Sequence, residues 1–451
     1  MFRRVLIANR GEVAARIART CRRMGIGVVA VASAADRDAA WLQTADEVVL
    51  VGPARSAASY LDVGAILTAA TRTRCSAVHP GWGFLSENAS FAQRAEAAGL
   101  AFVGPTAGQL RAMGDKSLAR ATMKSLGMPI IPGSDAPVSS GDEAARVAEA
   151  IGYPILLKAV AGGGGKGMRR VDRPEELAEA FANATAEAVA AFGDGRMYLE
   201  RRIVGGRHVE VQVVGDGRGG CVHFGERECS LQRRHQKVLE ESPSPALKDE
   251  VRDQVLARVT GALGQYNYRS AGTVEMLLDA DGNLWFMEMN TRLQVEHPVT
   301  EVRTGVDLVE WMFRVAAGEA LPLDQDAIRP VGHSLEVRIN AEDPDQGFRP
   351  SPGRVTALVL PSGEGIRVDT HLAAGDRIPP NYDSMVAKII AWGRDRPEAI
   401  ERMRLALAAT TVEGVVTNLE LHKRILQWDA FLAGAYDTTS LEPWLLAAAA
   451  G

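Results

Sequence analysis

Apolar and polar residues follow different periods in different parts of the chain. Over residues 1 to about 113, short apolar runs alternate with segments in which apolar residues have helical spacing. The runs predict strands and the spaced segments predict helices, an order typical of a parallel sheet covered by helices. The predicted strands are 5–8, 28–32, 48–51, 77–79 and 101–103, and the predicted helices lie near 12–24, 62–72 and 88–98. We therefore expect an α/β, Rossmann-like domain at residues 1–113.

Two further regions follow from the same pattern. Within residues 114–330, a subdomain at about 131–203 should contain a helix near 142–151, a strand at 155–159, a glycine run, a helix near 174–192 and a strand at 197–202. From residue 331 to residue 447, a clean alternation at His333 to Asn340 and amphipathic helices near 396–409 and 417–428 predict an α+β domain.

Residues 273–297 predict a β-hairpin in which two apolar runs flank a polar turn. A pairing of Asp279 with Leu284 across that turn would set Glu275 directly opposite Glu288. Side chains alternate between the two faces of a strand. The acidic face should therefore continue through Asn290, Arg292, Gln294 and Glu296.

Carboxylates that face each other across a hairpin repel and call for a compensating cation. Oxygen ligands suit a hard divalent metal such as Mg²⁺, which leaves coordination positions for phosphate oxygens. Glu275, Glu288 and Asn290 are therefore candidate ligands of a metal–nucleotide site. The alternative is a solvated hairpin face whose acids bind nothing.

The glycine run from Ala161 to Gly167 allows backbone N–H groups to approach phosphate oxygens, because no Cβ atoms obstruct them. It is not a Walker loop, since Met168 stands six residues after Gly162 where that motif has lysine. We expect a mobile lid over a triphosphate, with a merely flexible turn as the alternative. Lys158, inside an apolar strand, and Lys116, at a helix start, can reach a phosphate; a surface lysine is the alternative for Lys116.

Two polar segments lie further along the chain. Alternation from Arg207 to Val213 places His208, Glu210 and Gln212 on one face, and the preceding residues 199–203 end a strand where an adenine base can bind. Residues 226–237 combine His, Gln, Lys, Arg and Glu side chains. This mixture favours the anion-binding wall of an active site over a basic surface patch.

Composition excludes some classes of function. The chain has 46% hydrophobic and 24% charged residues, typical of a globular protein, and a net charge of −5. There is no overall basic field to attract nucleic acid or an anionic membrane, and no apolar run approaches the roughly 20 residues that cross a bilayer. Cys21, Cys75, Cys221 and Cys229 are scattered without a paired spacing. We expect buried thiols in a reducing cytoplasm, with a redox role as the alternative.

Six motifs, in order and at these separations, resemble those of one family. They are Ala8-Asn9-Arg10-Gly11-Glu12, the segment 79–88 (HPGWGFLSEN), the glycine run, 232–237 (QRRHQK), 288–298 (EMNTRLQVEHP) and 336–344 (EVRINAEDP). Over nearly its whole length the chain resembles the biotin carboxylase component of biotin-dependent carboxylases, which are ATP-grasp enzymes. The resemblance implies a Rossmann-like domain, a central ATP-grasp domain with a glycine-rich lid, and a C-terminal α+β domain.

The resemblance also implies a reaction. Bicarbonate attacks the γ-phosphate of ATP, the resulting carboxyphosphate releases CO₂, and the ureido nitrogen of biotin captures it. Glu296 matches the base that deprotonates bicarbonate, and Arg338 matches the residue that stabilises the biotin enolate. The matches to the anion-binding set are Lys237, Arg292, Gln294 and Val295.

Cofactor sites are implied in the same way. Glu275, Glu288 and Asn290 match the ligands of Mg²⁺ or Mn²⁺, with a pair of ions expected. The residues that match nucleotide contacts are Lys116, Lys158, Gly164, Gly165, Glu200, Arg201, Arg202, Ile203, His208, Gln232 and His235. Trp82 stands where many relatives have a tyrosine near the biotin ring.

The implied partners are a biotin carboxyl carrier protein or domain, a carboxyltransferase subunit and bicarbonate. A homodimer is expected, although Arg23 occupies a position that is acidic in some dimeric relatives. The sequence has no Ala-Met-Lys-Met biotinylation motif, so biotin is expected on another chain, or on the remainder of a longer subunit. The first half-reaction of an acetyl- or propionyl-CoA carboxylase is the predicted function, and an ATP-grasp ligase with another acceptor is the alternative.

Overall fold

The first layer of the protein is a parallel sheet near the N-terminus. The structure, a computed structural model, describes residues 1–160, 167–234 and 236–450. The sheet has the order β3-β2-β1-β4-β5. Its strands are β1 (Arg4–Ile7), β2 (Gly27–Ser33), β3 (Glu47–Gly52), β4 (Ala77–His79) and β5 (Ala101–Phe102). The parallel α/β sheet predicted for this region is confirmed, with boundaries that differ by a residue or two.

Helices cover both faces of the inner strands of this sheet, so β1 and β2 are mostly apolar and are buried after their first residue, whereas Val48 and Leu50 of the edge strand β3 are exposed. Val5 and Ile7 of β1 pack on the side of α1 (Gly11–Arg23), whereas Leu6 packs on the side of α2 (Val63–Arg72) and α3 (Ala89–Ala97). The helices α4 (Ala107–Gly114) and α5 (Lys116–Ser125) then lead into the subdomain predicted as a lid.

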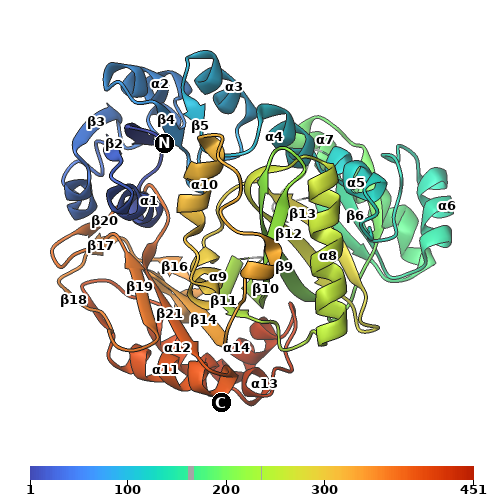
Figure 1. Cartoon of the computed structure of the whole chain (residues 1–451). Helices are drawn as coiled ribbons and strands as arrows, with labels where there is room; N and C mark the ends of the chain where they lie inside the picture. Colours follow the sequence, from blue (N-terminus) through green and yellow to red (C-terminus); the bar gives the residue numbers. More distant parts are fainter. Residues whose placement is uncertain (161–166, 235, 451) are drawn as a thin grey trace.

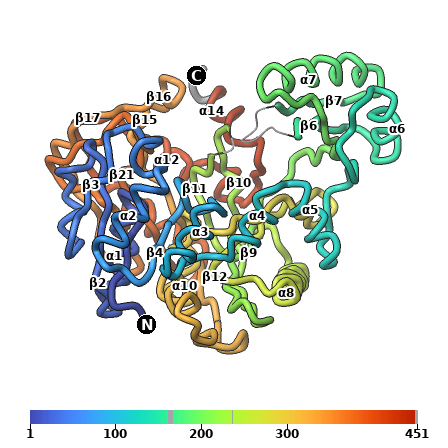
Figure 2. The backbone as a smooth tube through the Cα atoms, turned by 90° about the horizontal axis from the view of Figure 1, so that it is seen from above, coloured from blue at the N-terminus to red at the C-terminus, as the bar shows by residue number. Residues whose placement is uncertain are grey.

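That subdomain projects from the rest of the molecule in both views (Figures 1 and 2). It contains α6 (Gly141–Ile151), α7 (Leu177–Phe192) and a sheet of order β7-β6-β8. Its strands are β6 (Ile155–Ala159), β7 (Met168–Val171) and β8 (Met197–Arg201). Ile155 and Leu157 are buried against the helices, and Leu156 and Lys158 face the opposite side.

The centre of the protein is an eight-stranded sheet of order β13-β12-β9-β10-β11-β14-β21-β19. Its first five strands in this order are β13 (Leu284–Asn290), β12 (Arg269–Leu278), β9 (Arg207–Asp216), β10 (Cys221–Arg233) and β11 (Gln236–Ser242). The last three are β14 (His333–Asn340), β21 (Met385–Gly393) and β19 (Ile366–Thr370). Because β11 pairs with β14, the sheet runs continuously from the central region into the region after residue 331.

One face of this sheet is apolar and the other is polar where β9, β12 and β13 meet. Val209 and Val211 of β9 pack with Val274 and Met276 of β12 against α8 (Asp249–Gln265). The intervening residues therefore face the other way, as period-two alternation requires. This second face carries the acids and cations of the candidate site.

Smaller elements complete the chain. The connecting helices are α9 (His297–Thr304) and α10 (Leu308–Ala316). The C-terminal region adds α11 (Arg396–Ala408), α12 (Leu419–Ile425), α13 (Asp429–Leu432), α14 (Leu441–Ala450) and the short strands β15 (Glu342–Asp343), β16 (Arg349–Pro350), β17 (Gly353–Arg354), β18 (Ala357–Val359), β20 (Arg377–Ile378) and β22 (Thr411–Glu413). Over the described ranges, no helix has the length and apolar character needed to cross a membrane.

Candidate active site

A cavity of about 820 Å³ opens between the subdomain that contains β6–β8 and the polar face of the central sheet. Most of the predicted site residues line it: Trp82, Lys116, Lys158, Glu200, Arg201, Ile203, His208, Gln232, Lys237, Glu275, Glu288, Asn290, Arg292, Gln294, Val295, Glu296 and Arg338. Arg202 follows β8 and does not line the cavity. Gly164, Gly165 and His235 lie outside the described residues.

The hairpin β12–β13 places its acids as predicted, but through a different register. Asp279 does not pair with Leu284; Leu278 does, and the backbone N–H of Asp279 donates to Asn283 instead. A β-bulge then inserts one extra residue, Met287, so that Glu275 still lies opposite Glu288. The predicted turn register was wrong because it assumed an unbroken ladder.

The residues after Asn290 reach the cavity from a loop, not from a continued strand. Strand β13 ends at Asn290, so the predicted alternation through Arg292, Gln294 and Glu296 was wrong as local structure. Arg292 and Gln294 still contact the hairpin, and Glu296 is linked to Glu275 through Lys237. Arg292 donates to Asn290 Oδ1 at 2.8 Å and to Gln294 Oε1 at 3.0 Å. Gln294 Nε2 in turn donates to Glu275 Oε1 at 3.3 Å.

Lys237 on β11 is the cation at the centre of the site. Its Nζ lies 2.6 Å from Glu210, 2.9 Å from Glu275 and 2.6 Å from Glu296. Burial lowers the pKa of Lys237, but these three carboxylates outweigh burial and raise it well above its usual value. Lys237 is therefore a fixed positive charge in the cavity.

Glu296 is held between two cations. Lys237 binds its Oε1, and Arg338 on β14 donates to its Oε2 at 2.8 Å. Burial raises the pKa of Glu296 and Glu210 adds to that effect, but Lys237, Arg338 and Arg227 lower it, and the result is below the usual value. Glu296 is therefore ionised near neutral pH and can accept a proton.

Arg338 has a second acidic partner that the sequence interpretation missed. Glu240 on β11 is fully buried and forms an ion pair with Arg338. Burial raises the pKa of Glu240 to about 6, although Arg338 opposes this. Its position between Leu239 and Glu241 gave no sign in the sequence that Glu240 pairs with Arg338.

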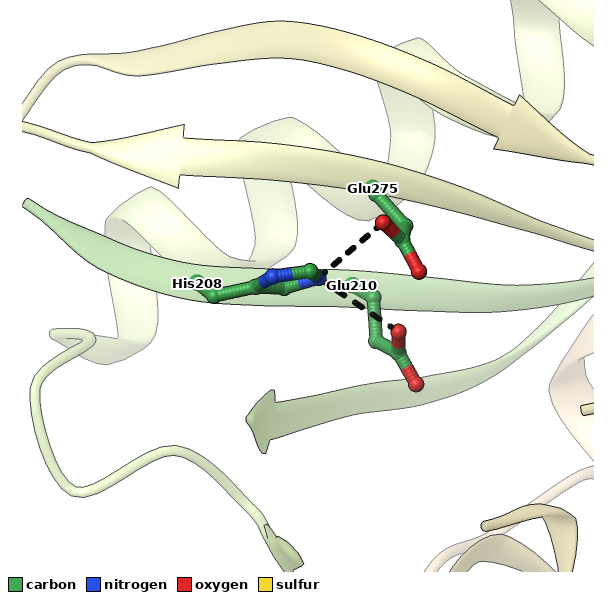
Figure 3. Close-up of side chains that lie close together, drawn as sticks. All are labelled: His208, Glu210 and Glu275. Carbon is green, nitrogen blue, oxygen red and sulfur yellow. Dashed lines mark ion pairs between the residues drawn. The ribbon is translucent and has the colours of Figure 1, made fainter. Parts of the chain in front are cut away.

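The face of β9 predicted from alternation is confirmed in contact detail. His208 lies 3.6 Å from Glu210 and 3.4 Å from Glu275, and the three side chains converge between β9 and β12 (Figure 3). Arg227 of β10, a site residue that sequence reasoning did not single out, is fully buried beside them. It donates to Glu210 at 2.6 Å and to Gln212 at 2.8 Å. The only sequence signal for Arg227 was its place in the polar segment 226–237.

The donor set fits a divalent cation. His208, Glu210 and Glu275 offer ligand atoms within 4.8 Å of one another, and Glu288 faces Glu275 across the hairpin. Burial and the Glu275 carboxylate raise the pKa of Glu288, although Lys116 and His208 oppose this. The predicted ligands Glu275 and Glu288 are therefore together, while Asn290 Oδ1 accepts from Arg292.

Basic and acidic groups meet again at the end of the cavity nearest β6 and β8. Glu200 forms ion pairs with Lys158 and, at 2.6 Å, with Arg120. Ser117, next to Lys116, is hydrogen-bonded to Tyr198 of β8. These contacts connect the subdomain to α5 and place two lysines along one wall.

Comparisons with known proteins agree with this geometry. Family models match residues 1–110 (Biotin carboxylase, N-terminal domain), 115–324 (Carbamoyl-phosphate synthase L chain, ATP binding domain) and 336–443 (Biotin carboxylase C-terminal domain). A biotin carboxylase of Pseudomonas aeruginosa is 51% identical over 443 residues, 98% of each chain. The chain belongs to the biotin carboxylase family. A biotin carboxylase of Nostoc sp. is 49% identical over 98% of this chain and 99% of that one.

Solved structures of this family superpose closely. A biotin carboxylase–beta-gamma-ATP complex from Campylobacter jejuni has a TM-score of 0.94 and 43% identity, covering 98% of this chain and 99% of that chain. The biotin carboxylase domain dimer of a Hydrogenobacter thermophilus 2-oxoglutarate carboxylase, with MgADP, ADP and bicarbonate, has a TM-score of 0.92 and 45% identity, covering 99% and 98%. The predicted family, fold class and activity, ATP-dependent carboxylation of biotin, are confirmed. The domain boundaries near 113 and 330 stay a prediction.

Proposed function

We propose that this biotin carboxylase carries out the first half-reaction of an acyl-CoA carboxylase, with Glu296 as the base for bicarbonate. The observation that carries the proposal is the Glu296 carboxylate, held at 2.6 Å by Lys237 and at 2.8 Å by Arg338 inside the cavity. A buried base between two cations stays ionised, and the same cations stabilise the negative charge that develops when bicarbonate loses its proton.

Bicarbonate would bind beside this base. We assign its binding to Lys237, Arg292, Gln294 and the backbone N–H of Val295, all of which line the cavity with Glu296. Their donors can hold the anion next to the γ-phosphate of ATP, so that an oxygen attacks phosphorus without a large loss of freedom at the reaction step. The products of that attack are carboxyphosphate and ADP.

Arg338 would then act on biotin. Carboxyphosphate releases CO₂ and phosphate, and the ureido nitrogen of biotin loses a proton before it attacks CO₂. The negative charge that forms on the ureido oxygen requires a permanent cation, and Arg338 supplies one on the cavity wall. Trp82 lines the same cavity and is our candidate for a contact with the biotin ring.

We assign a divalent cation to Glu275, Glu288 and Asn290, and the supporting observation is that Glu275 lies opposite Glu288 across the hairpin, with all three residues lining the cavity. When bound, Mg²⁺ or Mn²⁺ neutralises charge on the phosphates of ATP, and we expect two ions. For the nucleotide itself we propose the described residues Lys116, Lys158, Glu200, Arg201, Arg202, Ile203, His208 and Gln232. The predicted contacts of Gly164, Gly165 and His235 remain part of this proposal without structural description.

The partners that we propose are a biotin carboxyl carrier protein or domain and a carboxyltransferase subunit, in the cytoplasm. The final acceptor is proposed to be acetyl- or propionyl-CoA. A homodimer is supported by the dimeric relative from Hydrogenobacter thermophilus. Within this chain, Arg16 pairs with Glu301 at 2.8 Å and Arg23 pairs with Glu310 at 2.6 Å.

The test is bicarbonate-dependent release of phosphate from MgATP, with and without biotin, for the native chain, Glu296→Ala and Arg338→Ala. We expect biotin-stimulated release in the native chain, a fall of about 10²-fold or more in Glu296→Ala, and loss of the biotin stimulation in Arg338→Ala. Glu241→Gln, which alters a buried acid paired with Arg396 away from the cavity, is the matched control. Release that ignores both biotin and Arg338 would indicate an ATP-grasp ligase with another acceptor.

A further inference from the structure

Two donors bind the loop between β13 and α9 from the side opposite the cavity. His297 Nδ1 lies 2.7 Å from the carbonyl oxygen of Gln294, and Lys388 Nζ donates to the carbonyl of Val295 at 2.8 Å. In a trans peptide the C=O and N–H bonds point in opposite directions. The N–H groups of Val295 and Glu296, which belong to these two peptides, therefore point away from His297 and Lys388.

The same two N–H groups are available to a ligand. Within the ranges that the structure describes, neither the N–H of Val295 nor that of Glu296 donates a hydrogen bond to the protein. Both residues line the cavity. Successive N–H groups that face one space form a site with positive potential, suited to a small anion.

Lys388 is an unusual residue to find at its position on β21. Its side chain has 0% exposure, and lysine is seldom buried without a specific partner. Its ion-pair partner is Glu12, at 3.1 Å, from the first turn of α1. Across the sheet it lies opposite Arg338 on β14 and Asp369 on β19.

The motif Ala8-Asn9-Arg10-Gly11-Glu12 thereby acquires a structural explanation. Glu12 has 1% exposure, and the Lys388 ammonium is the cation within ion-pair distance of it. The acid of α1 can balance the charge of Lys388, while the lysine still has a proton to donate to Val295. Lys388 is thus joined to the loop between β13 and α9, at Val295, a residue 93 positions away along the chain.

We propose that Lys388 is a positioning residue for bicarbonate. By holding the carbonyl of Val295, and with His297 holding that of Gln294, it turns the N–H groups of Val295 and Glu296 into the cavity as a preformed anion site. The inference deepens the proposed function, because it rests on the assignment of the Val295 N–H to bicarbonate binding.

A purely structural role is the competing explanation, since Lys388 also joins α1 to the central sheet. The two roles predict different kinetics. Loss of positioning should raise the KM for bicarbonate while the KM for ATP stays near its native value, because ATP is assigned to other residues of the cavity. Loss of structure alone should reduce the amount of active enzyme. The KM for bicarbonate should then not change relative to the KM for ATP.

The experiment compares Lys388→Met with the double variant Glu12→Gln/Lys388→Met and the native chain. The double variant removes both charges of this ion pair together, so Glu12 is not left as an unpaired carboxylate in the core. Arg396→Met is the matched control: it deletes a largely buried cation that pairs with Glu241 at 2.7 Å and does not line the cavity. For each protein, KM for bicarbonate, KM for MgATP, kcat for phosphate release and the thermal midpoint are measured.

We expect the KM for bicarbonate to rise about tenfold or more in both Lys388 variants, with the KM for MgATP within about twofold. Arg396→Met should lower the thermal midpoint and leave the KM for bicarbonate unchanged. A native KM for bicarbonate in the double variant, parallel rises in both constants, or failure of both variants to fold would overturn the proposal. Absence of bicarbonate-dependent release in the native chain would instead refute the proposed function.

Discussion

Replacement of Arg227 by methionine removes a fully buried cation that does not line the cavity but organises it. The guanidinium donates to Glu210 at 2.6 Å, Gln212 at 2.8 Å, Thr300 at 2.9 Å and Thr273 at 3.2 Å. These partners lie on β9, β12 and α9. Arg227→Met therefore loses contacts to three elements at once.

The size of the effect follows from these contacts. A net contribution of about 1 kcal/mol for each neutral partner and about 2 kcal/mol for the charged one amounts to about 5 kcal/mol. Methionine regains part of this, because it carries no charge that must be desolvated. We expect a net loss of about 3–5 kcal/mol in the free energy of unfolding, the range found when one partner of a buried pair is removed.

The same substitution should change the pH dependence of catalysis. Arg227 is one of three cations that lower the pKa of Glu296 against burial and Glu210. Its removal raises that pKa, so the acidic limb of the kcat/KM profile for bicarbonate should move to higher pH. Arg227→Lys, which retains the charge without the forked geometry, should move the limb less.

Urea unfolding followed by circular dichroism, and the pH profile of bicarbonate-dependent phosphate release, measure the two effects of Arg227→Met. A loss of unfolding free energy below about 1 kcal/mol, the value of an exposed ion pair, would refute the stability argument. An acidic limb that stays at its native position would refute the electrostatic argument.

Three further outcomes follow from other contacts. Burial lowers the pKa of His422 from 6.5 to about 4. The contribution of the neutral, buried imidazole to the free energy of unfolding is therefore fully present above pH 6.5 and is lost as the pH falls through 4. Between pH 6.5 and pH 4, the free energy of unfolding of His422→Gln should therefore fall by about 3 kcal/mol less than that of the native chain. An unchanged pH dependence of the urea midpoint would contradict this. Glu288→Gln removes one of two facing acids and should raise the Mg²⁺ concentration for half-maximal phosphate release about tenfold or more; an unchanged metal titration would exclude it as a ligand. Asn9 donates to the carbonyls of Pro80 at 2.6 Å and Trp82 at 2.8 Å, so Asn9→Ala should raise the KM for biotin and not that for MgATP, and a matched rise of both would count against a local effect.

Much of the site could be predicted because its signals are local. Alternation along β9 correctly placed His208, Glu210 and Gln212 on one face, since the period of a strand needs no tertiary information. The hairpin prediction brought Glu275 and Glu288 together, but through a register that the structure corrects. The bulge at Met287 compensated for the wrong turn pairing, and a bulge has no dependable signature in one sequence.

The remaining site residues depend on which strands become neighbours. Arg227, Glu240 and Lys388 lie on β10, β11 and β21, and each contacts groups contributed by distant parts of the chain. No periodicity distinguishes a buried arginine or lysine from an exposed one, because the partner that makes burial favourable is absent from the local sequence. Glu12 and Lys388 belong to opposite ends of the chain.

By itself, the sequence determined the parallel first sheet, the polar face of β9, the family motifs and the presence of the acidic hairpin, since these depend on residue type and spacing along the chain. Only the tertiary structure decided that β11 pairs with β14, which brings Lys237 and Arg338 to opposite oxygens of Glu296. It also decided that Lys388 donates a hydrogen bond to the carbonyl of Val295, in the loop between β13 and α9. The physical reason is that strand order and the pairing of buried charges are set by the packing of the whole chain.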